Sequence, residues 1–236
     1  MSDTLFYNPE ILTSSQLTEI ESNHCIKVLR LKIGDSINVT DGKGHLYQCI
    51  IVENNSKRTA VNIINQIDIP NPRDYNLQIA FAPTKQMDRN EWFVEKATEI
   101  GIDRISPIIS NFSERKEIKI EKLTKTAISA MKQSQQFYLP QIDDTIGFNE
   151  FLKLPFRGNK FIAHCYDSPK MLLSKTYQKG ENALILIGPE GDFSEEEVES
   201  AKDCGFIPIS LGSSRLRSET ASLVATLTIS IVNSLS

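Results

Sequence analysis

The sequence predicts an α/β protein in which a parallel sheet covered by helices follows a smaller domain that is mostly β. From Leu77 onward, apolar runs of strand length alternate with longer helical patterns, which is typical of a parallel sheet. Before that point, short strand-like runs and turn residues dominate the chain. The two regions meet at Pro70-Asn71-Pro72, so we expect one domain over residues 1–70 and a second over residues 73–236.

One short helix and three strands are expected in the first domain. The helix covers Ser15–Leu29. Ser36–Thr40 and Leu46–Val52 flank Asp41-Gly42-Lys43-Gly44, a turn sequence that strongly indicates a β-hairpin. A further strand covers Ala60–Ile69, a stretch rich in isoleucine and asparagine.

In the second domain, the expected strands and helices alternate along the chain. They are, in order, the strand Gln78–Ala82, the helix Asp88–Ile100, the strand Ile105–Ile109, the helix Glu121–Gln135 and the strand Phe161–Cys165. The helix Asp88–Ile100 is amphipathic. We expect its Trp92 to lie in the core rather than to serve as a stacking surface for a nucleobase.

The segment 183–221 is the most informative part of the chain. Ala183–Ile187 is a continuous apolar run, as expected for a strand buried on both faces. Gly188 and Gly191 follow, and without a Cβ they let the backbone turn sharply and approach a ligand closely. Ser194 then stands three residues before Glu197, which predicts a capping box at the start of a helix.

The remainder of this segment predicts a strand and a last helix. Gly205 is expected to end the preceding helix, and Phe206–Leu211 forms the strand. Ser218 is expected to cap the last helix, with Glu219 in its first turn. The loops after the two strands are well placed to build one ligand pocket. The glycines alone would equally fit an ordinary strand–helix–strand unit, and neither a Walker A loop nor a dinucleotide fingerprint is present.

The full string is more specific than its glycines. Ile187-Gly188-Pro189-Glu190-Gly191, followed by Leu211-Gly212 and by Leu216-Arg217-Ser218-Glu219-Thr220-Ala221, resembles the RsmE family, the 16S ribosomal RNA uridine-N3 methyltransferases of the SPOUT superfamily. The same resemblance is carried by His24–Asp35, Asp41–Gly44, Lys85, Glu91-Trp92, Lys96–Gly101, Gln133-Ser134 and Leu139-Pro140. It therefore covers nearly the whole chain.

The resemblance implies a fold, a cofactor and partners that periodicity does not reveal. It implies a C-terminal SPOUT domain with a deep trefoil knot, a PUA-like β-barrel domain at the N-terminus, and S-adenosylmethionine bound by the knot loops. It also implies a homodimer that acts on 16S rRNA of the small ribosomal subunit. The cofactor-binding residues implied are Ile187, Gly188, Gly191, Leu211, Gly212 and Leu216.

In the implied reaction, a uridine attacks the methyl group through N3, so the N3 proton must leave and the base must be unpaired. Arg217 is the leading catalytic candidate because a guanidinium can hold a phosphate or stabilise a uridine anion. A surface ion pair with Glu219 or Glu190 is the alternative role for Arg217. Glu190 and Glu219 are candidate bases, although loop ordering or helix capping explains each of them as well.

The expected RNA contacts come from both domains. They are His24, Lys27, Arg30, Lys32, Lys96 and Gln133. A solvated helix face explains Lys96 equally well, and a loop or capping role explains His24.

Four residues depart from the family pattern. Asp192 stands where a second glycine is usual, Ser214 and Arg215 replace the usual Arg-Ile, and Gln136 stands where an arginine usually follows Gln-Ser. These changes affect the expected details of the RNA site rather than the fold.

The overall charge argues against a free-standing nucleic-acid binder, because the chain carries a net charge of −4. Residues 1–70 hold 6 Lys+Arg against 8 Asp+Glu. Local patches rather than net charge contact phosphates, so this balance does not exclude RNA. The six cations of this region could share one face, and they are Lys27, Arg30, Lys32, Lys43, Lys57 and Arg58.

The spacing of the cysteines and histidines gives no metal-ligand pattern, so no metal site is expected. The four cysteines are expected to be buried free thiols, and they are Cys25, Cys49, Cys165 and Cys204. The N-terminal residues show no secretion signal, and polar residues interrupt the last apolar helix. We therefore expect a cytoplasmic protein without a membrane span.

Three other functions remain open from the sequence. The first is a methyltransferase of the same fold that modifies a different RNA base. The second is an RNA-binding module that has lost its methyl donor, which the departures at Asp192 and Gln136 would allow. The third is a protein-interaction scaffold, which predicts neither cofactor binding nor RNA affinity.

Overall fold

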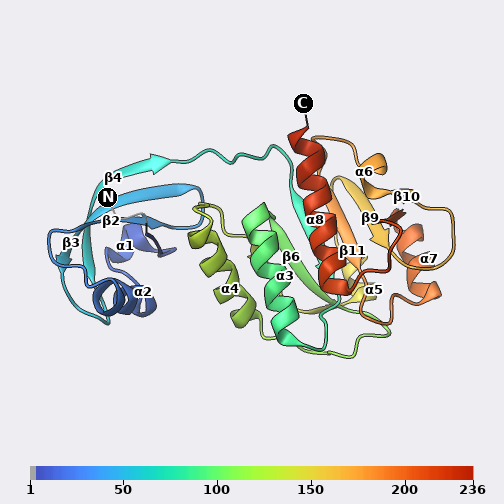
Figure 1. Ribbon diagram of the computed structural model, residues 1–236, viewed down its shortest axis with the longest axis horizontal. Helices are drawn as coiled ribbons and strands as arrows, with labels where there is room; N and C mark the ends of the chain where they lie inside the picture. The colour runs from blue at the N-terminus through green and yellow to red at the C-terminus, as the bar shows by residue number, and fades with distance from the viewer. Residues whose placement is uncertain (1–3, 236) are drawn as a thin grey trace. The chain divides into compact units, whose positions relative to one another are not determined.

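The structure is a computed structural model, and it describes residues 4–235 (Figure 1). The chain forms two compact units. The first runs to Pro72 and takes in Ile128–Leu139, and the second comprises Arg73–Ala127 and the chain from Pro140 onward. Nothing in the sequence predicts that Ile128–Leu139 belongs with the first unit.

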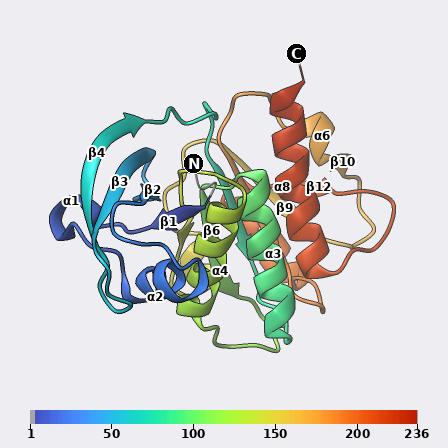
Figure 2. The ribbon, with the colours of Figure 1, turned by 60° about the vertical axis from the view of Figure 1, so that its left-hand side comes forward.

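The first unit contains a four-stranded sheet in the order β1-β2-β3-β4 (Figure 2). Its strands are β1 (Leu5–Tyr7), β2 (Ser36–Thr40), β3 (His45–Glu53) and β4 (Ala60–Asp68). β2 and β3 are antiparallel, with Thr40 opposite Leu46, which confirms the predicted hairpin. β1 pairs in parallel with β2, and its three residues were too short a run to predict.

The predicted helix Ser15–Leu29 is wrong at its start. Gln16 forms a β-bridge with Ala60, and Leu17 N donates a hydrogen bond to Thr59 O, so this stretch is held against β4 instead. The helix α2 (Glu19–Asn23) begins after Thr18, whose side chain caps it. A π-helix, η1 (His24–Val28), continues the chain. A short helix, α1 (Ile11–Ser14), lies before this region.

Ile128–Leu139 is attached to the first unit by hydrogen bonds and by one buried ion pair. Gly44 N donates to Phe137 O at 2.9 Å, and Leu139 N donates to Gly42 O at 2.9 Å. Lys132 Nζ lies 2.5 Å from Glu21 Oε1, and the Glu21 side chain is only 5% exposed. These contacts make the hairpin loop and α2 depend on a segment that is distant in the sequence.

The second unit is built on a parallel sheet, as predicted. Its strand order is β10-β12-β9-β11-β5-β6-β7, and every neighbouring pair along this path is parallel. The strands are β5 (Leu77–Phe81), β6 (Arg104–Ile109), β7 (Gln141–Ile142), β9 (Asn159–Ala163), β10 (Met171–Leu172), β11 (Ala183–Ile187) and β12 (Ile207–Ser210), and β8 (Ile146–Gly147) also pairs with β6. The central strand β11 is buried along its whole length.

Helices cover both faces of this sheet. They are α3 (Met87–Ile100), α4 (Ile120–Gln133), α5 (Phe148–Phe151), α6 (Leu173–Thr176), α7 (Glu195–Asp203) and α8 (Ser218–Ser234). α3 and α8 pack side by side on one face, and α5 and α7 pack against the other around Phe193 and Leu186 (Figure 1). The trefoil knot within this unit stays a prediction.

Trp92 does not lie in the core, contrary to expectation. It is 40% exposed, whereas Phe93, Val94 and Ala97 of the same helix are fully buried. The amphipathic pattern of α3 is satisfied by those three residues, and this leaves Trp92 on the outer side. Among residues 4–235, no helix has both the length and the apolar character needed to span a membrane.

The start of α7 confirms the predicted capping box. Ser194 Oγ accepts a hydrogen bond from Glu197 N at 3.2 Å, and Glu197 Oε2 accepts one from Ser194 N at 2.9 Å. Gly205 follows the helix with φ 84°, as predicted for the residue after a C-cap. The predicted cap of α8 is wrong by one residue, because Arg217 has the extended backbone of an N-cap and the helix itself begins at Ser218.

We expect Ser194→Ala to lower the free energy of unfolding by about 1 kcal/mol, because it leaves an N-terminal amide of α7 without its acceptor. Urea unfolding followed by circular dichroism measures this difference. Ser200→Ala is the matched control, since Ser200 Oγ only donates to a carbonyl within the same helix. Equal losses in the two variants would contradict a capping role for Ser194.

Candidate functional site

A pocket of about 730 Å³ lies at the carboxyl ends of three adjacent strands of the second unit. β12, β9 and β11 are neighbours in the sheet, and the segment after each strand forms part of the pocket wall. The lining residues are 163–168 and 170, 187–190 and 192, and 209–218 and 221. This edge of an open parallel sheet is where ligands usually bind.

The segment after β11 is a tight turn that leaves little room for a side chain at Gly188. A Cβ at Gly188 would lie 3.1 Å from Phe193 N. Asp192 N donates to Pro189 O at 3.0 Å, and Asp192 has a left-handed φ of 68°. Gly191 lies outside the pocket lining, where a Cβ would come within 3.0 Å of Phe112 Cβ. Gly188 therefore belongs to the pocket, and Gly191 packs behind it.

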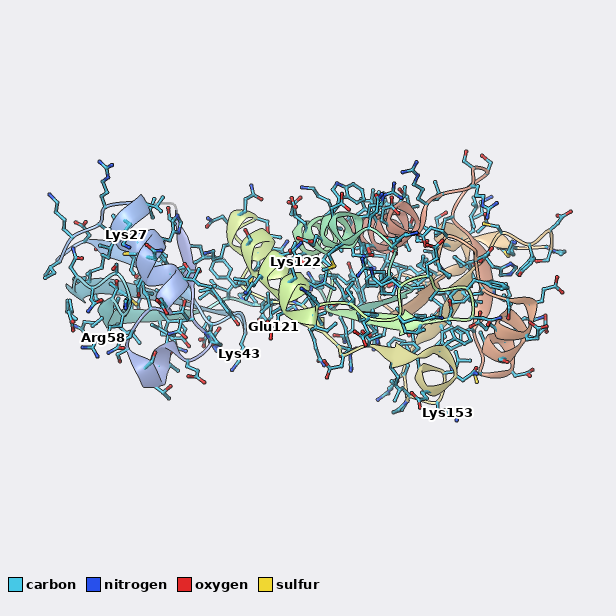
Figure 3. The ribbon with its side chains drawn as sticks, turned by 90° about the horizontal axis from the view of Figure 1, so that it is seen from below. Lys27, Lys43, Arg58, Glu121, Lys122 and Lys153 are labelled. Carbon is cyan, nitrogen blue, oxygen red and sulfur yellow. The ribbon has the colours of Figure 1, made fainter. Side chains whose placement is uncertain are left out.

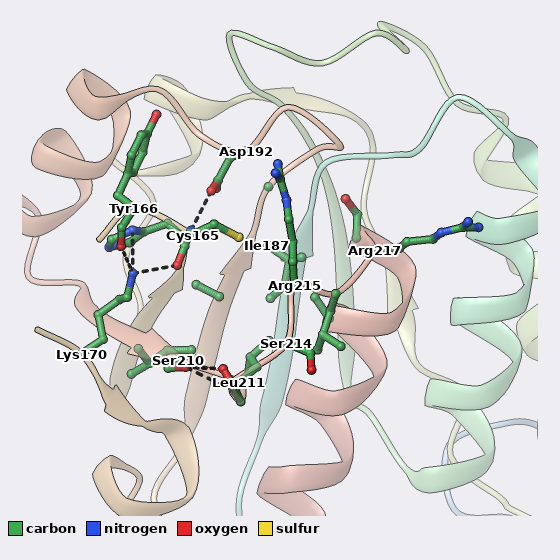
Figure 4. A pocket seen from close by; sticks show the side chains of 18 of the residues that line it. Cys165, Tyr166, Lys170, Ile187, Asp192, Ser210, Leu211, Ser214, Arg215 and Arg217 are labelled. Atoms are coloured by element: carbon green, nitrogen blue, oxygen red, sulfur yellow. Dashed lines mark hydrogen bonds between the residues drawn. The ribbon is translucent and has the colours of Figure 1, made fainter. Parts of the chain in front are cut away.

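The segment after β9 forms a second part of the wall (Figure 4). Lys170 Nζ donates to His164 O at 3.0 Å and also to Tyr166 O. Tyr166 OH donates to Phe193 O at 2.7 Å, which ties this segment to the one after β11. Sequence reasoning did not include these residues in the site. Their position after a predicted strand, at the same edge of the sheet, is the signal that could have found them.

Burial and nearby charges shift the pKa values of three side chains in this part of the wall. Burial lowers the pKa of His164, and the ammonium of Lys170 lowers it further. The Cys165 thiol is partly desolvated although the residue is exposed, and this desolvation raises its pKa, with the carboxylate of Asp192 adding to the shift. Burial likewise raises the pKa of Tyr166, with Asp192 again contributing. His164 is therefore neutral at physiological pH, and Cys165 and Tyr166 are protonated.

The segment after β12 carries the third part of the wall. Ser210 Oγ donates to Gly212 O at 2.9 Å and accepts from Gly212 N at 3.3 Å, so the turn is closed locally. Gly212 has φ 147°, and a Cβ there would meet no atom within 4 Å. Leu211 and Leu216 line the pocket and are half-buried.

The two arginines of this segment point in different directions. Figure 4 shows Arg215 extending between the walls towards Asp192, whereas Arg217 turns away from it. Arg217 is exposed, and its side chain makes no hydrogen bond or ion pair with residues 4–235. The ion pair considered as the alternative role for Arg217 is therefore absent from the described part of the chain.

The two candidate glutamates have other partners. Glu190 lines the pocket, and its Oε1 accepts a hydrogen bond from Lys85 N at 3.2 Å. Glu219 is outside the lining and buried, with Oε1 at 3.7 Å from Arg89 Nε of α3. Glu219 Oε2 has no hydrogen-bond partner among the described residues. Of the two, only Glu190 faces the pocket.

Most of the expected RNA contacts lie in the first unit. Lys27, Arg30 and Lys32 are exposed, and His24 is half-buried with its ring 6.0 Å from that of Phe6. Gln133 ends α4 and is exposed. Figure 3 shows Lys27, Lys43 and Arg58 at separate places on the first unit, so the six cations of residues 1–70 do not form one cluster.

Lys96 is engaged within its own helix. Its Nζ lies 2.7 Å from Glu95 Oε1 and 2.9 Å from Glu99 Oε1. Hydrogen bonds to both carboxylates raise the pKa of Lys96. Its charge is therefore balanced locally, which agrees with the helix-face alternative.

The four cysteines are free, but they are not all buried. Cys25 and Cys49 lie in the core of the first unit, and burial raises the pKa of each thiol to about 11. Cys204 is partly exposed and Cys165 is exposed. The expectation of burial was wrong for Cys165 because its segment has left β9 and lines the pocket.

Comparison with known proteins identifies the family. A family model described as an RNA methyltransferase domain matches residues 71–230, and another described as an RNA methyltransferase PUA domain matches residues 17–64. The ribosomal RNA small subunit methyltransferase E of Rickettsia conorii is 29% identical over 230 residues, which cover 94% of this chain and 92% of the relative. The chain belongs to the RsmE family.

Solved structures agree with membership of the RsmE family. A probable rRNA-methyltransferase from Porphyromonas gingivalis has a TM-score of 0.93 and 42% identity, with 98% of each chain covered. The ribosomal RNA small subunit methyltransferase E of Neisseria gonorrhoeae, solved bound to S-adenosyl methionine, has a TM-score of 0.85 and 27% identity, with 97% of each chain covered. These matches confirm the predicted α/β fold with an N-terminal PUA domain.

The structure explains one departure from the RsmE pattern. Asp192 stands at the usual position of a glycine, and its left-handed φ of 68° is a conformation that glycine adopts freely. Ser214 and Arg215 both line the pocket. Gln136 lies in the segment Ile128–Leu139 of the first unit.

Proposed function

We propose that the protein is an S-adenosylmethionine-dependent methyltransferase that methylates N3 of a specific uridine in 16S rRNA. Its proposed partner is the small ribosomal subunit, and its proposed place of action is the cytoplasm. The observation that carries the proposal is the pocket built by the segments after β9, β11 and β12. The bound S-adenosyl methionine in the Neisseria gonorrhoeae relative supports this choice of cofactor.

The residues of the pocket fit this cofactor. A volume of about 730 Å³ lies within the range of roughly 300–1,000 Å³ that is usual for small-molecule sites. Ile187, Leu211 and Leu216 offer apolar surface to an adenine ring, and Gly188 and Gly212 leave backbone groups uncovered. We propose that these five residues hold the cofactor.

Gly191 has an indirect place in this proposal. It lies outside the pocket lining and packs against Phe112, so it holds the turn in shape.

When bound, the cofactor supplies an electrophilic methyl group. The chain itself must place the uracil ring and accommodate the proton that leaves its N3.

Arg217 is the proposed catalytic cation. It is exposed at the pocket, and neither Glu190 nor Glu219 neutralises it. A guanidinium without a carboxylate partner can stabilise negative charge on the uracil oxygens as the N3 proton leaves.

The two glutamates take different proposed roles. Glu190 lines the pocket, so it is the proposed proton acceptor. Glu219 is buried against Arg89 of α3, so its proposed role is to anchor the start of α8 and thereby the position of Arg217.

The proposed RNA contacts follow from exposure. Lys27, Arg30 and Lys32 present free cationic groups for phosphates, and they are accompanied by His24 and Gln133. Lys96 is a weaker contact, because Glu95 and Glu99 balance its charge.

We also propose that the protein is a homodimer. Leu227 and Ile231 of α8 are 42% and 49% exposed, and Trp92 of the neighbouring helix α3 is 40% exposed. A second copy would bury this apolar surface. We expect Ile231→Asp to shift the mass measured by light scattering from dimer towards monomer, and the matched control Ile207→Asp to leave it unchanged. A monomeric wild-type protein would contradict the proposal.

The methyl-transfer reaction tests the proposed function. Small ribosomal subunits from a strain that lacks its own enzyme of this type would be incubated with the protein and radiolabelled cofactor. Mass spectrometry of rRNA fragments would then locate the methyl group. We expect it on N3 of one uridine of 16S rRNA. Methylation of another base would contradict the acceptor, and the absence of both methylation and cofactor binding would contradict the enzyme.

A further inference from the structure

The carboxylate of Asp192 joins two of the three parts of the pocket wall. Asp192 Oδ2 accepts a hydrogen bond from Cys165 N at 2.7 Å, and Asp192 Oδ1 accepts one from Phe193 N at 2.8 Å. Cys165 follows β9 and Phe193 follows β11, and these strands are neighbours in the sheet. One short side chain therefore holds together the segments that leave two adjacent strands, as Figure 4 shows for Cys165.

The backbone at this position would suit glycine better than aspartate. Asp192 has φ 68°, and its own N–H closes the turn onto Pro189 O at 3.0 Å. Aspartate is one of the few residues with a Cβ that tolerate this conformation. In this chain the carboxylate of Asp192 accepts two charge-assisted hydrogen bonds that glycine could not make, and these offset the unfavourable backbone conformation.

The bond between Asp192 and Cys165 lies within the pocket wall. Asp192, Cys165 and Tyr166 all line the pocket. Tyr166 OH donates to Phe193 O at 2.7 Å, which makes a second link between the same two segments. In the segment after β12, the hydrogen bonds of Ser210 Oγ go to Gly212 of the same segment. The distance between the segments after β9 and β11 therefore depends on Asp192 more than on the segment after β12.

We propose that Asp192 is a positioning residue for the methyl donor. By holding the segments after β9 and β11 together, it sets the width of the pocket before the cofactor enters. This inference rests on the proposed function of the pocket. A purely local role, in which Asp192 only caps Phe193 N, would leave the position of Cys165 independent of it.

Two substitutions at position 192 distinguish the effect of the carboxylate from the effect of the backbone conformation. Asp192→Gly removes both acceptors and suits the left-handed φ, so the variant is expected to fold. Asp192→Asn keeps the shape and one carbonyl oxygen, so it can keep only one of the two bonds. We expect the glycine variant to raise the dissociation constant and the KM for S-adenosylmethionine roughly tenfold, while kcat stays within about twofold. The asparagine variant is expected to lie between the glycine variant and the wild type.

Amide hydrogen exchange supplies a readout independent of the reaction. The Cys165 amide is expected to exchange faster in Asp192→Gly, because its acceptor is gone. The amide of Ile185, inside β11, is expected to be unchanged. Asp203→Asn is the control for loss of charge, since Asp203 is exposed at the end of α7 and outside the pocket lining.

The outcomes distinguish this inference from the proposed function. If the wild type binds S-adenosylmethionine and Asp192→Gly binds it equally well, Asp192 does not position the pocket, although the proposed function stands. If the wild type binds no S-adenosylmethionine at millimolar concentration, both proposals are wrong. Weaker binding in the glycine variant, with partial recovery in the asparagine variant, supports the inference.

Discussion

Arg217→Ala is expected to lower kcat for methyl transfer about 100-fold, while the dissociation constant for S-adenosylmethionine stays within about twofold of the wild type. The guanidinium is exposed beside the pocket and has no carboxylate partner in the described chain. Figure 4 shows its side chain turned away from Asp192, so we expect its loss to leave Gly188, Leu211 and Gly212 in place. Single-turnover methylation of small subunits and calorimetry with the cofactor measure the two effects separately.

Arg157→Ala is the matched control for Arg217→Ala. Arg157 is also exposed and belongs to the same unit, but it lies outside the pocket lining. We expect it to retain the wild-type rate. Arg215→Ala tests the rival assignment of the catalytic cation, because Arg215 extends between the walls of the pocket. If Arg215→Ala abolished methyl transfer and Arg217→Ala did not, the catalytic cation would be Arg215.

Lys132→Ala is expected to destabilise the first unit by about 3–5 kcal/mol. Lys132 Nζ lies 2.5 Å from Glu21 Oε1, and the Glu21 side chain is 5% exposed. Glu21 Oε2 already lacks a hydrogen-bond partner among the described residues, so removing Lys132 would leave a buried carboxylate without its ion-pair partner. Urea unfolding followed by circular dichroism gives the loss in free energy.

Two further variants test whether the buried pair causes that loss. Glu21→Leu combined with Lys132→Ala removes both charges, and we expect it to recover much of the stability. Lys202→Ala breaks the exposed pair with Glu199, and we expect a loss of at most about 1 kcal/mol. A Lys132→Ala variant no less stable than Lys202→Ala would show that the pair does not hold Ile128–Leu139 in place.

Local signals in the sequence were sufficient where one segment determines its own structure. Ala183–Ile187 was predicted with the bounds that β11 has, because a continuous apolar run between a turn and a glycine leaves few alternatives. The capping box of Ser194 and Glu197 and the hairpin after Thr40 were also predicted, since each depends on neighbouring residues.

Features that depend on distant residues were missed. β7, β8 and β10 have two residues each and form only because β6 or β12 offers a partner. The helix expected from Ser15 begins later because Gln16 and Leu17 bond to the chain around β4. In each case, pairing with a distant segment decides the local conformation, and sequence periodicity does not contain that information.

The candidate site shows the same division. The glycine turns and Arg217 were predicted from the resemblance, whereas the wall formed by residues 163–170 was not. Its contribution depends on β9 lying beside β11 and on the contact between Asp192 and Cys165, which are 27 residues apart. Likewise, the pairing of Glu219 with Arg89 depends on α8 packing against α3.

The central claim is that the segments after β9, β11 and β12 form the site of the methyl donor. A crystal structure of the protein with S-adenosylmethionine tests it most directly. We expect the adenosyl group between the turn at Gly188 and the segment from Leu211 to Leu216. Cofactor density elsewhere on the molecule, or an empty pocket at millimolar cofactor, would contradict the claim.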